Sequence, residues 1–303
     1  MIDAHKFLMS YYHSKNPKAS VSTQQPLMYV ERLRIRQPGD AGFALGPHVD
    51  GGSIERWEDA GYGKGRVFDD IFRGAWEDFD PWETSGRIDA VSDLYHSAGS
   101  CSMFRLFQGW LSMSHTGPRE GTLLVNPLFN LATAYYLLRP FFIPRCSPVS
   151  LETAKGNEQA YTRETLDPSN WTLEESTTSN IQGAWPGSGQ ELNHLWHPHL
   201  DLPHTMVHVP RIAPGDYVAW HCDTIHAVDR VHQGTGDSSV LYIPACPTTR
   251  ASLDYVKLQR DHFEQGVPPQ DFPGGEGESK HIGRGELEDL RAKASEASLR
   301  ALG

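Results

Sequence analysis

The stretch TMVHVPRIAPGDYVAWHCDTIHAVDRVHQGTGDSSVLYIPACP, residues 205–247, contains several short segments that are rich in β-branched and aromatic residues. Turn residues such as Pro214-Gly215-Asp216 separate these segments. Short strands with regular turns between them are typical of a β-sandwich or a β-barrel. The stretch therefore predicts one half of such a core.

Three segments nearer the N-terminus extend this pattern. They read MYVERLRIRQPGD at 28–40, CSMFRLFQGWLSMS at 101–114 and TLLVNPLF at 122–129. In the middle one, alternation places Phe104, Leu106, Gln108 and Trp110 on one face of a strand. Helix-compatible stretches lie at 1–16, 67–78, 86–96 and 130–142.

These segments predict a single, mainly β domain over residues 1–303. Its core covers about 27–250, and a helical C-terminal tail covers about 251–303. Flanking helices accompany the core, and residues 51–98 and 144–203 form long insertions.

The composition excludes several classes of protein. The 303 residues carry a formal net charge of −11, which disfavours binding to the phosphates of nucleic acids. No apolar run approaches the roughly 20 residues of a membrane span, and the first residues lack the order of a signal peptide. The cysteines 101, 146, 222 and 246 show no CxxC spacing and are expected to be reduced. We therefore expect a cytoplasmic protein with a small-molecule substrate.

The segment Gly46-Pro47-His48-Val49-Asp50-Gly51-Gly52 is a candidate metal site. Residues i and i+2 of a strand point to the same side, so His48 and Asp50 can share one ion. A third ligand can come from the segment after Pro214-Gly215-Asp216, which holds His221 and His226. We prefer His226, because it opens a new strand after a short connection. Two histidines and one carboxylate form the facial triad of non-haem Fe(II) oxygenases.

Other histidine patterns show how weak each motif is alone. His199-Leu200-Asp201 repeats the His-x-Asp spacing, and His194, His197, His199 and His204 form a second histidine-rich stretch. This second stretch could hold zinc, but loop histidines near a pocket are the simpler interpretation.

Several longer blocks resemble the DUF1479 family. They are LRIRQPGDAGFALGPHVDGGSIERWED, FRLFQGWLSMS, GTLLVNPLF, LLRPFF, HPHL and PGDYVAWHCDTIHAV, and the match runs from about Tyr29 to Thr249. That family is similar to Fe(II)/2-oxoglutarate-dependent dioxygenases. The resemblance implies a double-stranded β-helix (jelly-roll) core, with His48, Asp50 and His226 as iron ligands. It also implies O₂ and 2-oxoglutarate as cosubstrates, and succinate and CO₂ as products.

The position of the basic residue departs from the wider superfamily. Many of these enzymes carry an Arg or Lys about ten residues beyond the distal histidine, where this chain reads GTGDSSV at 234–240. A dicarboxylate still needs a cationic partner, preferably a guanidinium. Arg105 is the first candidate and Arg34 and Arg36 are the next. Thr122 and Ser239 can add hydroxyl contacts.

A capping loop is a further expectation. Glu55-Arg56-Trp57 follows the metal motif, and Trp76 and Trp82 lie beyond it. These residues either cap the pocket or pack in the core.

The preferred function is an Fe(II)/2-oxoglutarate-dependent dioxygenase that hydroxylates or otherwise oxidises a small organic molecule. One alternative is a cupin-like metal-dependent isomerase or a 2-oxoglutarate-independent dioxygenase. The other is a catalytically inactive β-helix binding protein.

Overall fold

The computed structural model describes residues 1–303 except 30–31, 43, 98–99, 147–161, 177 and 273–274. Val30 of the first predicted strand and residues 147–161 of the second insertion therefore lie outside the described residues.

The described strands are β1 Ser22–Leu27, β2 Leu33–Arg36, β3 His48–Val49, β4 Phe107–Ser112, β5 Leu123–Val125, β6 Phe142–Pro144, β7 Trp171–Leu173, β8 Gln190–Glu191, β9 Val207–His208, β10 Tyr217–His221, β11 His226–Val228, β12 Ser238–Tyr242 and β13 Cys246–Thr248. The described α-helices are α1 Ile2–Met9, α2 Asp69–Phe72, α3 Ser85–Asp89, α4 Phe129–Leu138, α5 Arg163–Leu166, α6 Leu202–Thr205, α7 Arg250–Gln265, α8 Leu287–Lys293 and α9 Glu296–Ala301. The 3₁₀ helices are η1 Ile54–Trp57, η2 Tyr62–Gly65, η3 Trp76–Asp78, η4 Arg139–Phe141, η5 Pro168–Asn170 and η6 Pro198–Leu200.

The expectation of a mainly β chain is confirmed only in part, because helices and strands both contribute. The described residues contain more helix than strand. The predicted flanking helices are present as α1 to α4, and the tail folds into α7, α8 and α9. The fold is therefore mixed, with antiparallel sheets at its centre.

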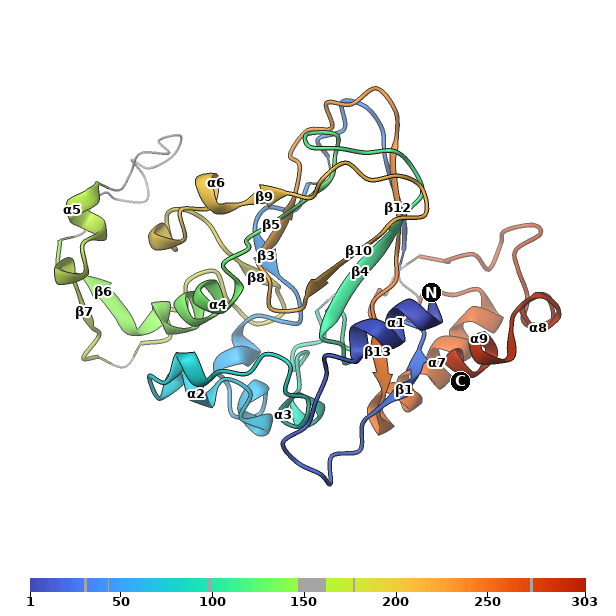
Figure 1. Ribbon diagram of the computed structural model, residues 1–303, viewed down its shortest axis with the longest axis horizontal. Helices are drawn as coiled ribbons and strands as arrows, with labels where there is room; N and C mark the ends of the chain where they lie inside the picture. Colours follow the sequence, from blue (N-terminus) through green and yellow to red (C-terminus); the bar gives the residue numbers. More distant parts are fainter. Residues whose placement is uncertain (30–31, 43, 98–99, 147–161, 177, 273–274) are drawn as a thin grey trace.

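Two sheets form this centre (Figure 1). One has the order β10-β4-β12-β2 and the other has the order β8-β3-β11-β5-β9. All of their pairings are antiparallel. Trp110 of β4 and Trp220 of β10 pack against Leu123 of β5 in one apolar cluster. The two sheets therefore bury their facing side chains against each other.

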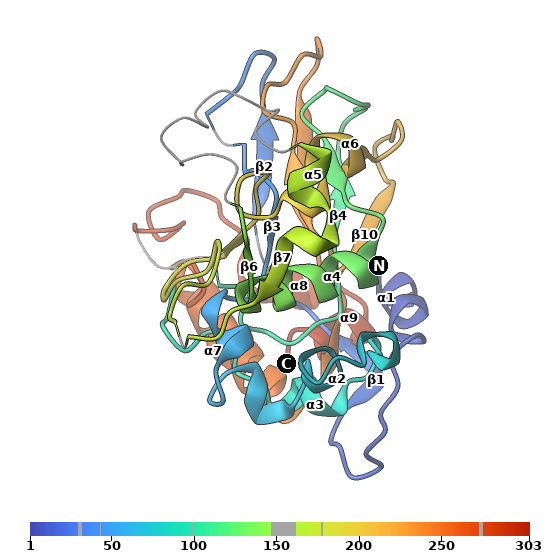
Figure 2. The same cartoon turned by 90° about the vertical axis from the view of Figure 1, so that its left-hand side faces the viewer.

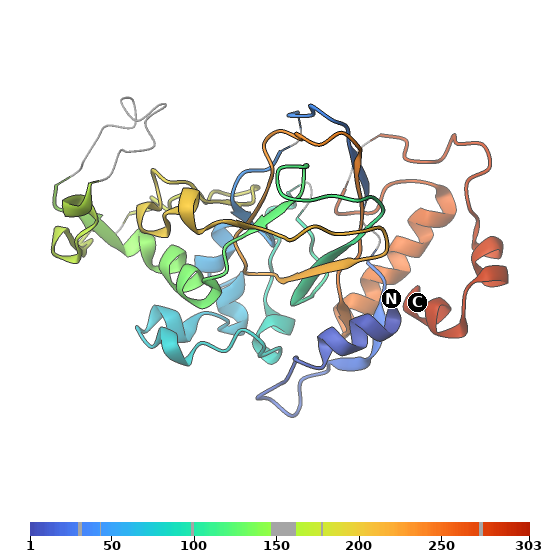
Figure 3. The same ribbon diagram turned by 45° about the horizontal axis from the view of Figure 1, so that its top comes forward.

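Helices lie on both flanks of the sheets. α2 and α4 lie on the side of β3 and β8 in Figures 1 and 2, where Ile71 and Leu137 pack with Val49 and Ile225. The first insertion therefore supports the strands that carry the metal motif. On the other flank, Figure 3 shows both termini beside α7.

The sequence explains why α7 begins and ends where it does. The Thr249 hydroxyl accepts a hydrogen bond from the Ser252 amide at 3.0 Å, which caps the first turn. Gly266 ends the helix in the left-handed conformation at φ +70°. Val256 is buried against Leu27 and Tyr29, so the helix is anchored to the segment that leads into the core.

Among the described residues, no helix combines the length and the hydropathy that a bilayer crossing requires. Cys101, Cys146, Cys222 and Cys246 are all thiols, as the sequence predicted.

Candidate metal centre

His48 and His226 face each other across two paired strands. They are register partners in the antiparallel β3–β11 pair, and their ring centroids lie 4.2 Å apart. Asp50 follows His48 by two residues, and its carboxylate joins them. Its Oδ1 lies 3.6 Å from His48 Nε2, and its Oδ2 lies 3.4 Å from His226 Nε2. One potential ligand atom from each residue lies within 4.8 Å of the others.

The backbone fixes which ring nitrogen of each histidine can bind a metal. His48 Nδ1 lies 2.7 Å from the Gly46 carbonyl oxygen, and His226 Nδ1 lies 2.9 Å from the Thr224 carbonyl oxygen. A carbonyl can only accept, so each Nδ1 carries the proton and each Nε2 keeps its lone pair. Metal-binding histidines show this arrangement. Two neutral imidazoles and one carboxylate suit a divalent transition metal.

The charge state of the trio also suits a cation. Burial, and then the proximity of His226, lower the pKa of His48 to about 4, so this imidazole is neutral near pH 7. Burial alone would raise the pKa of Asp50. Hydrogen bonding to His226 and the charges of His226, His48 and Arg105 hold that pKa well below its usual range. Asp50 is therefore an ionised ligand.

Gln108 orients the Asp50 carboxylate. The Gln108 side chain is buried in β4, and its Nε2 donates to Asp50 Oδ2 at 2.9 Å. β4 belongs to the sheet opposite β3, so this bond ties the metal motif to both sheets.

Glycines follow Asp50 because the chain turns there in a confined space. Gly51 has φ +87° and Gly52 has φ +76°, a region that side chains rarely adopt. A Cβ on Gly52 would lie 2.2 Å from the Ser92 carbonyl oxygen. The segment Ser53–Trp57 can therefore fold back under the metal motif as η1.

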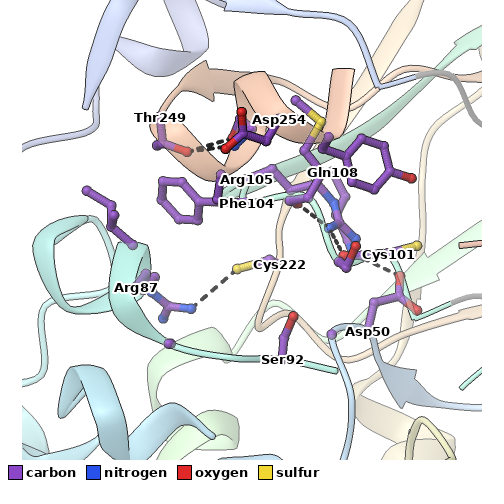
Figure 4. A pocket seen from close by; sticks show the side chains of 18 of the residues that line it. Asp50, Arg87, Ser92, Cys101, Phe104, Arg105, Gln108, Cys222, Thr249 and Asp254 are labelled. Atoms are coloured by element: carbon purple, nitrogen blue, oxygen red, sulfur yellow. Dashed lines mark hydrogen bonds between the residues drawn. The ribbon is translucent and has the colours of Figure 1, made fainter. Parts of the chain in front are cut away.

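A cavity of about 460 Å³ lies beside Asp50 (Figure 4). Asp50 alone of the three predicted ligands lines it, together with Gln108 and Arg105. The Arg105 side chain is buried, and its Nη1 donates to the carbonyl oxygens of Cys101 and Met103, at 2.5 and 2.9 Å. These bonds hold the guanidinium at the cavity wall. The position fits the predicted role of Arg105 as a partner for a carboxylate.

Arg34 and Arg36 lie elsewhere. They line a separate cavity of about 30 Å³ between the sheets, with Thr122 and Ser238. Arg36 is buried and donates to the carbonyl oxygens of Asp229 and Asp40, each at 2.7 Å. Its charge therefore holds loops together. Arg34 Nη1 donates to the Tyr242 hydroxyl at 3.4 Å.

The structure does not bring Ser239 to either cavity. Ser238 is opposite Arg36 in the β12–β2 pair and lines the small cavity, whereas Ser239 is opposite Ile35, which is exposed. The Ser239 hydroxyl donates to the Asp237 carboxylate. Adjacent strand residues point to opposite faces, so the prediction selected the wrong one of two neighbouring serines.

His221 is held in a second group with Cys222 and Asp223. Its Nε2 donates to the Pro81 carbonyl oxygen at 3.0 Å, and its Nδ1 accepts from the Asp223 amide at 3.1 Å. Both ring nitrogens are therefore used. Asp223 also forms a buried ion pair with Arg87. Burial, and then Asp223, raise the pKa of the Cys222 thiol to about 12, so that thiol is protonated.

The second histidine-rich stretch serves local structure. His199 contacts the Tyr135 hydroxyl and the Leu166 carbonyl oxygen, and His204 contacts Asp201. No metal-like group among the described residues includes these histidines.

The tryptophans expected near the pocket pack elsewhere. Trp57 Nε1 donates to the Leu137 carbonyl oxygen, and Trp82 packs on Phe107 and His221. Trp57 and Trp76 pack against the cluster around Val49. They support the core, which was the second of the two interpretations.

Comparison with known proteins agrees with these motifs. The chain matches the Gig2-like family over residues 1–303. It is 32% identical over 282 residues to the "Uncharacterized protein YbiU" of Escherichia coli (strain K12), which covers 93% of this chain and 57% of that protein.

Two solved structures cover all of this chain. One is GlcNAc Inducible Gene 2, GIG2 (DUF1479), from Candida albicans, with a TM-score of 0.81, 33% identity and 62% of that chain covered. The other is named "Putative Oxidoreductase from Salmonella typhimurium LT2", with a TM-score of 0.79, 32% identity and 63% of that chain covered. The chain thus spans less than two thirds of the length of these relatives. It belongs to the Gig2-like (DUF1479) family.

Proposed function

We propose that this chain is a non-haem Fe(II)/2-oxoglutarate-dependent dioxygenase that oxidises a small organic molecule. The observation that carries the proposal is the convergence of His48 Nε2, His226 Nε2 and the Asp50 carboxylate, with both Nδ1 atoms fixed by carbonyl oxygens. Three protein ligands on one side of an ion leave positions for a chelating cosubstrate and O₂. The structural neighbour named as an oxidoreductase agrees with this class.

The strand order supports a double-stranded β-helix as the core. Along the chain, β2, β3, β4 and β5 alternate between the two sheets, and β9, β10, β11 and β12 alternate again. Jelly rolls built from two antiparallel sheets have this kind of order. The metal motif then lies where β3 and β11 pair.

The residues of this chain divide the work of binding. His48, Asp50 and His226 would hold the iron, which when bound supplies the activation of O₂. Gln108 and the Gly46 and Thr224 carbonyls hold those ligands in place. Arg105, at the wall of the cavity that Asp50 lines, would pair with the distal carboxylate of 2-oxoglutarate. The same cavity would exclude bulk water and admit the substrate.

The four thiols support a cytoplasmic location, because the cytosol keeps cysteines reduced.

Anaerobic spectroscopy tests the proposal. Fe(II) is added to the apoprotein, followed by 2-oxoglutarate. We expect a visible charge-transfer band that requires both, and succinate after O₂ is admitted. His48→Ala abolishes both signals, whereas His204→Ala, at an exposed position, retains them. Failure of the wild-type chain to bind Fe(II) contradicts the proposal.

One observation favours the 2-oxoglutarate-independent alternative. β12, which reads SSVLY at 238–242, carries no basic residue. Fe(II) binding without any spectral response to 2-oxoglutarate would support that alternative.

A further inference from the structure

Two buried side chains hold the backbone directly after the first two metal-binding residues. Arg56 in η1 donates from Nη2 to the Asp50 carbonyl oxygen at 2.6 Å and from Nη1 to the Gly52 carbonyl oxygen at 2.5 Å. Tyr62 in η2 donates its hydroxyl to the Gly51 carbonyl oxygen at 2.9 Å. Three successive carbonyl groups, at 50, 51 and 52, are therefore held by side chains.

Arg56 is 1% exposed. A buried guanidinium is costly unless its N–H groups are paired, so its position requires a structural reason. Here the acceptors of Nη1 and Nη2 are carbonyl oxygens of the metal loop. The guanidinium also lies 5.5 Å from the centroid of the Tyr62 ring, so the two side chains support each other.

The loop needs such support because its residues are intrinsically pliable. Gly51 and Gly52 both have positive φ, and glycine has more conformational freedom than any other residue. Glu55 holds the next residue, since its carboxylate accepts from the Ser53 amide at 2.8 Å. The buried pair Glu55 and Arg56 thus immobilises residues 50–53 from below.

We propose that Arg56 is a positioning residue that directs the Asp50 carboxylate toward His48 and His226, and that Tyr62 assists it. The inference rests on the proposed function, because it assumes that Asp50 binds a metal. By fixing the peptide groups that follow Asp50 and Gly51, the planar fork of Arg56 sets the direction in which the Asp50 side chain leaves the backbone. Lysine keeps the charge but cannot bind two carbonyls in one plane.

Binding of Co(II) alone tests this inference without turnover. Titration is followed by calorimetry and by the visible absorption of the bound Co(II). Arg56→Lys is expected to lower Co(II) affinity about 10- to 100-fold, the usual effect of removing support behind a metal ligand. The absorption spectrum of the bound ion is expected to change shape, which a loss of stability alone does not cause.

Arg139→Lys is the matched control. Arg139 also donates to two backbone carbonyls, those of Trp196 and Phe142, but it does not contact the metal loop. This variant is expected to keep Co(II) affinity within about twofold of the wild type, whatever its thermal stability. A folded Arg56→Lys protein with wild-type affinity and spectrum overturns the proposal.

Tyr62→Phe covers the case in which Arg56→Lys fails to fold. It removes a single hydroxyl, and we expect an affinity loss of a few-fold. If Tyr62→Phe binds Co(II) like the wild type while Arg56→Lys is unfolded, the proposal is overturned. If the wild-type chain itself binds no Co(II), the proposed function fails first, and the two failures are thus distinguishable.

Discussion

His226 pairs with His48 in the β3–β11 register, and this pairing places the two imidazole rings 4.2 Å apart. The ligands are thus positioned by the sheet itself. Because adjacent residues of a strand face opposite sides, a slip of one residue would separate the rings and destroy the site. The site therefore depends on residues that fix the register as well as on the ligands.

Replacing either histidine of this pair should abolish metal binding. His226→Ala removes an Nε2 lone pair, and we expect Co(II) affinity to fall by more than about 100-fold, beyond the effect of outer residues. His221→Asn is the control, because both nitrogens of His221 already serve the backbone. Calorimetry at one ion per chain checks this. Loss of binding in His221→Asn, with His226→Ala unaffected, would assign the third ligand to His221.

Gln108 should matter for the metal although it is not a ligand. Gln108→Leu removes the donor to Asp50 Oδ2, and we expect roughly a tenfold loss of Co(II) affinity. Gln259→Leu is a matched control, because Gln259 is also buried but donates to the Met28 carbonyl oxygen in another part of the core. Equal affinities in the two variants would show that the Gln108 bond has no influence on the site.

Gly52→Ala should be far more destabilising than Gly39→Ala. Both glycines have positive φ, so both variants incur about 1–2 kcal/mol of backbone strain. A Cβ at Gly39 has no atom within 4 Å, whereas at Gly52 it meets the Ser92 carbonyl oxygen at 2.2 Å. We expect Gly52→Ala to lower the free energy of unfolding by at least about 2 kcal/mol more. Urea unfolding of both variants measures the difference, and similar midpoints would contradict it.

The sequence was sufficient for the positions of the core strands and for the three converging residues. Alternation and turn residues mark strands whatever their partners are, so β4, β5, β10, β11 and β12 lie inside the predicted segments. The preference for His226 over His221 rested on strand order. In the structure it is His226 that pairs with His48.

The facing of individual polar side chains was harder to predict. In Ser238–Tyr242 both alternating sets contain apolar residues, Val240 and Tyr242 on one face and Leu241 on the other. Hydrophobicity therefore could not decide which serine faces inward. Gln108 did carry a signal, since it is an amide on an otherwise apolar strand face. The role of Arg56 had none, because it depends on how η1 folds back beneath Asp50.

Acid should destabilise the protein through its buried histidines. Burial lowers the pKa of His197 to about 3 and those of His5 and His221 to about 4, from an unfolded value of about 6.5. Below pH 6.5 the unfolded chain binds protons that the folded chain refuses, so the free energy of unfolding falls as pH falls toward 4. Above pH 6.5 these groups contribute no pH dependence.

Denaturant unfolding at pH 6 and pH 5 measures this effect. Between these values each buried histidine should contribute a loss of about 1 kcal/mol. His197→Gln should reduce the loss by that amount, whereas His281→Gln, at an exposed position, should leave it unchanged. An identical pH dependence in wild type and His197→Gln would show that His197 is protonated in the folded state.

Arg105 should determine the affinity for 2-oxoglutarate without determining that for iron. Its guanidinium lines the cavity that Asp50 also lines, and it is held there by the Cys101 and Met103 carbonyls. A charge-assisted hydrogen bond contributes about 1.5–3 kcal/mol, so Arg105→Met should raise the dissociation constant of 2-oxoglutarate about 10- to 100-fold. Titration of the anaerobic charge-transfer band at saturating Fe(II) measures this constant, and calorimetry measures Fe(II) affinity separately. Arg34→Met tests the competing site, because Arg34 lines the small cavity between the sheets. An unchanged constant in Arg105→Met together with a large increase in Arg34→Met would move the cosubstrate into the space between the sheets and leave the larger cavity to the substrate alone.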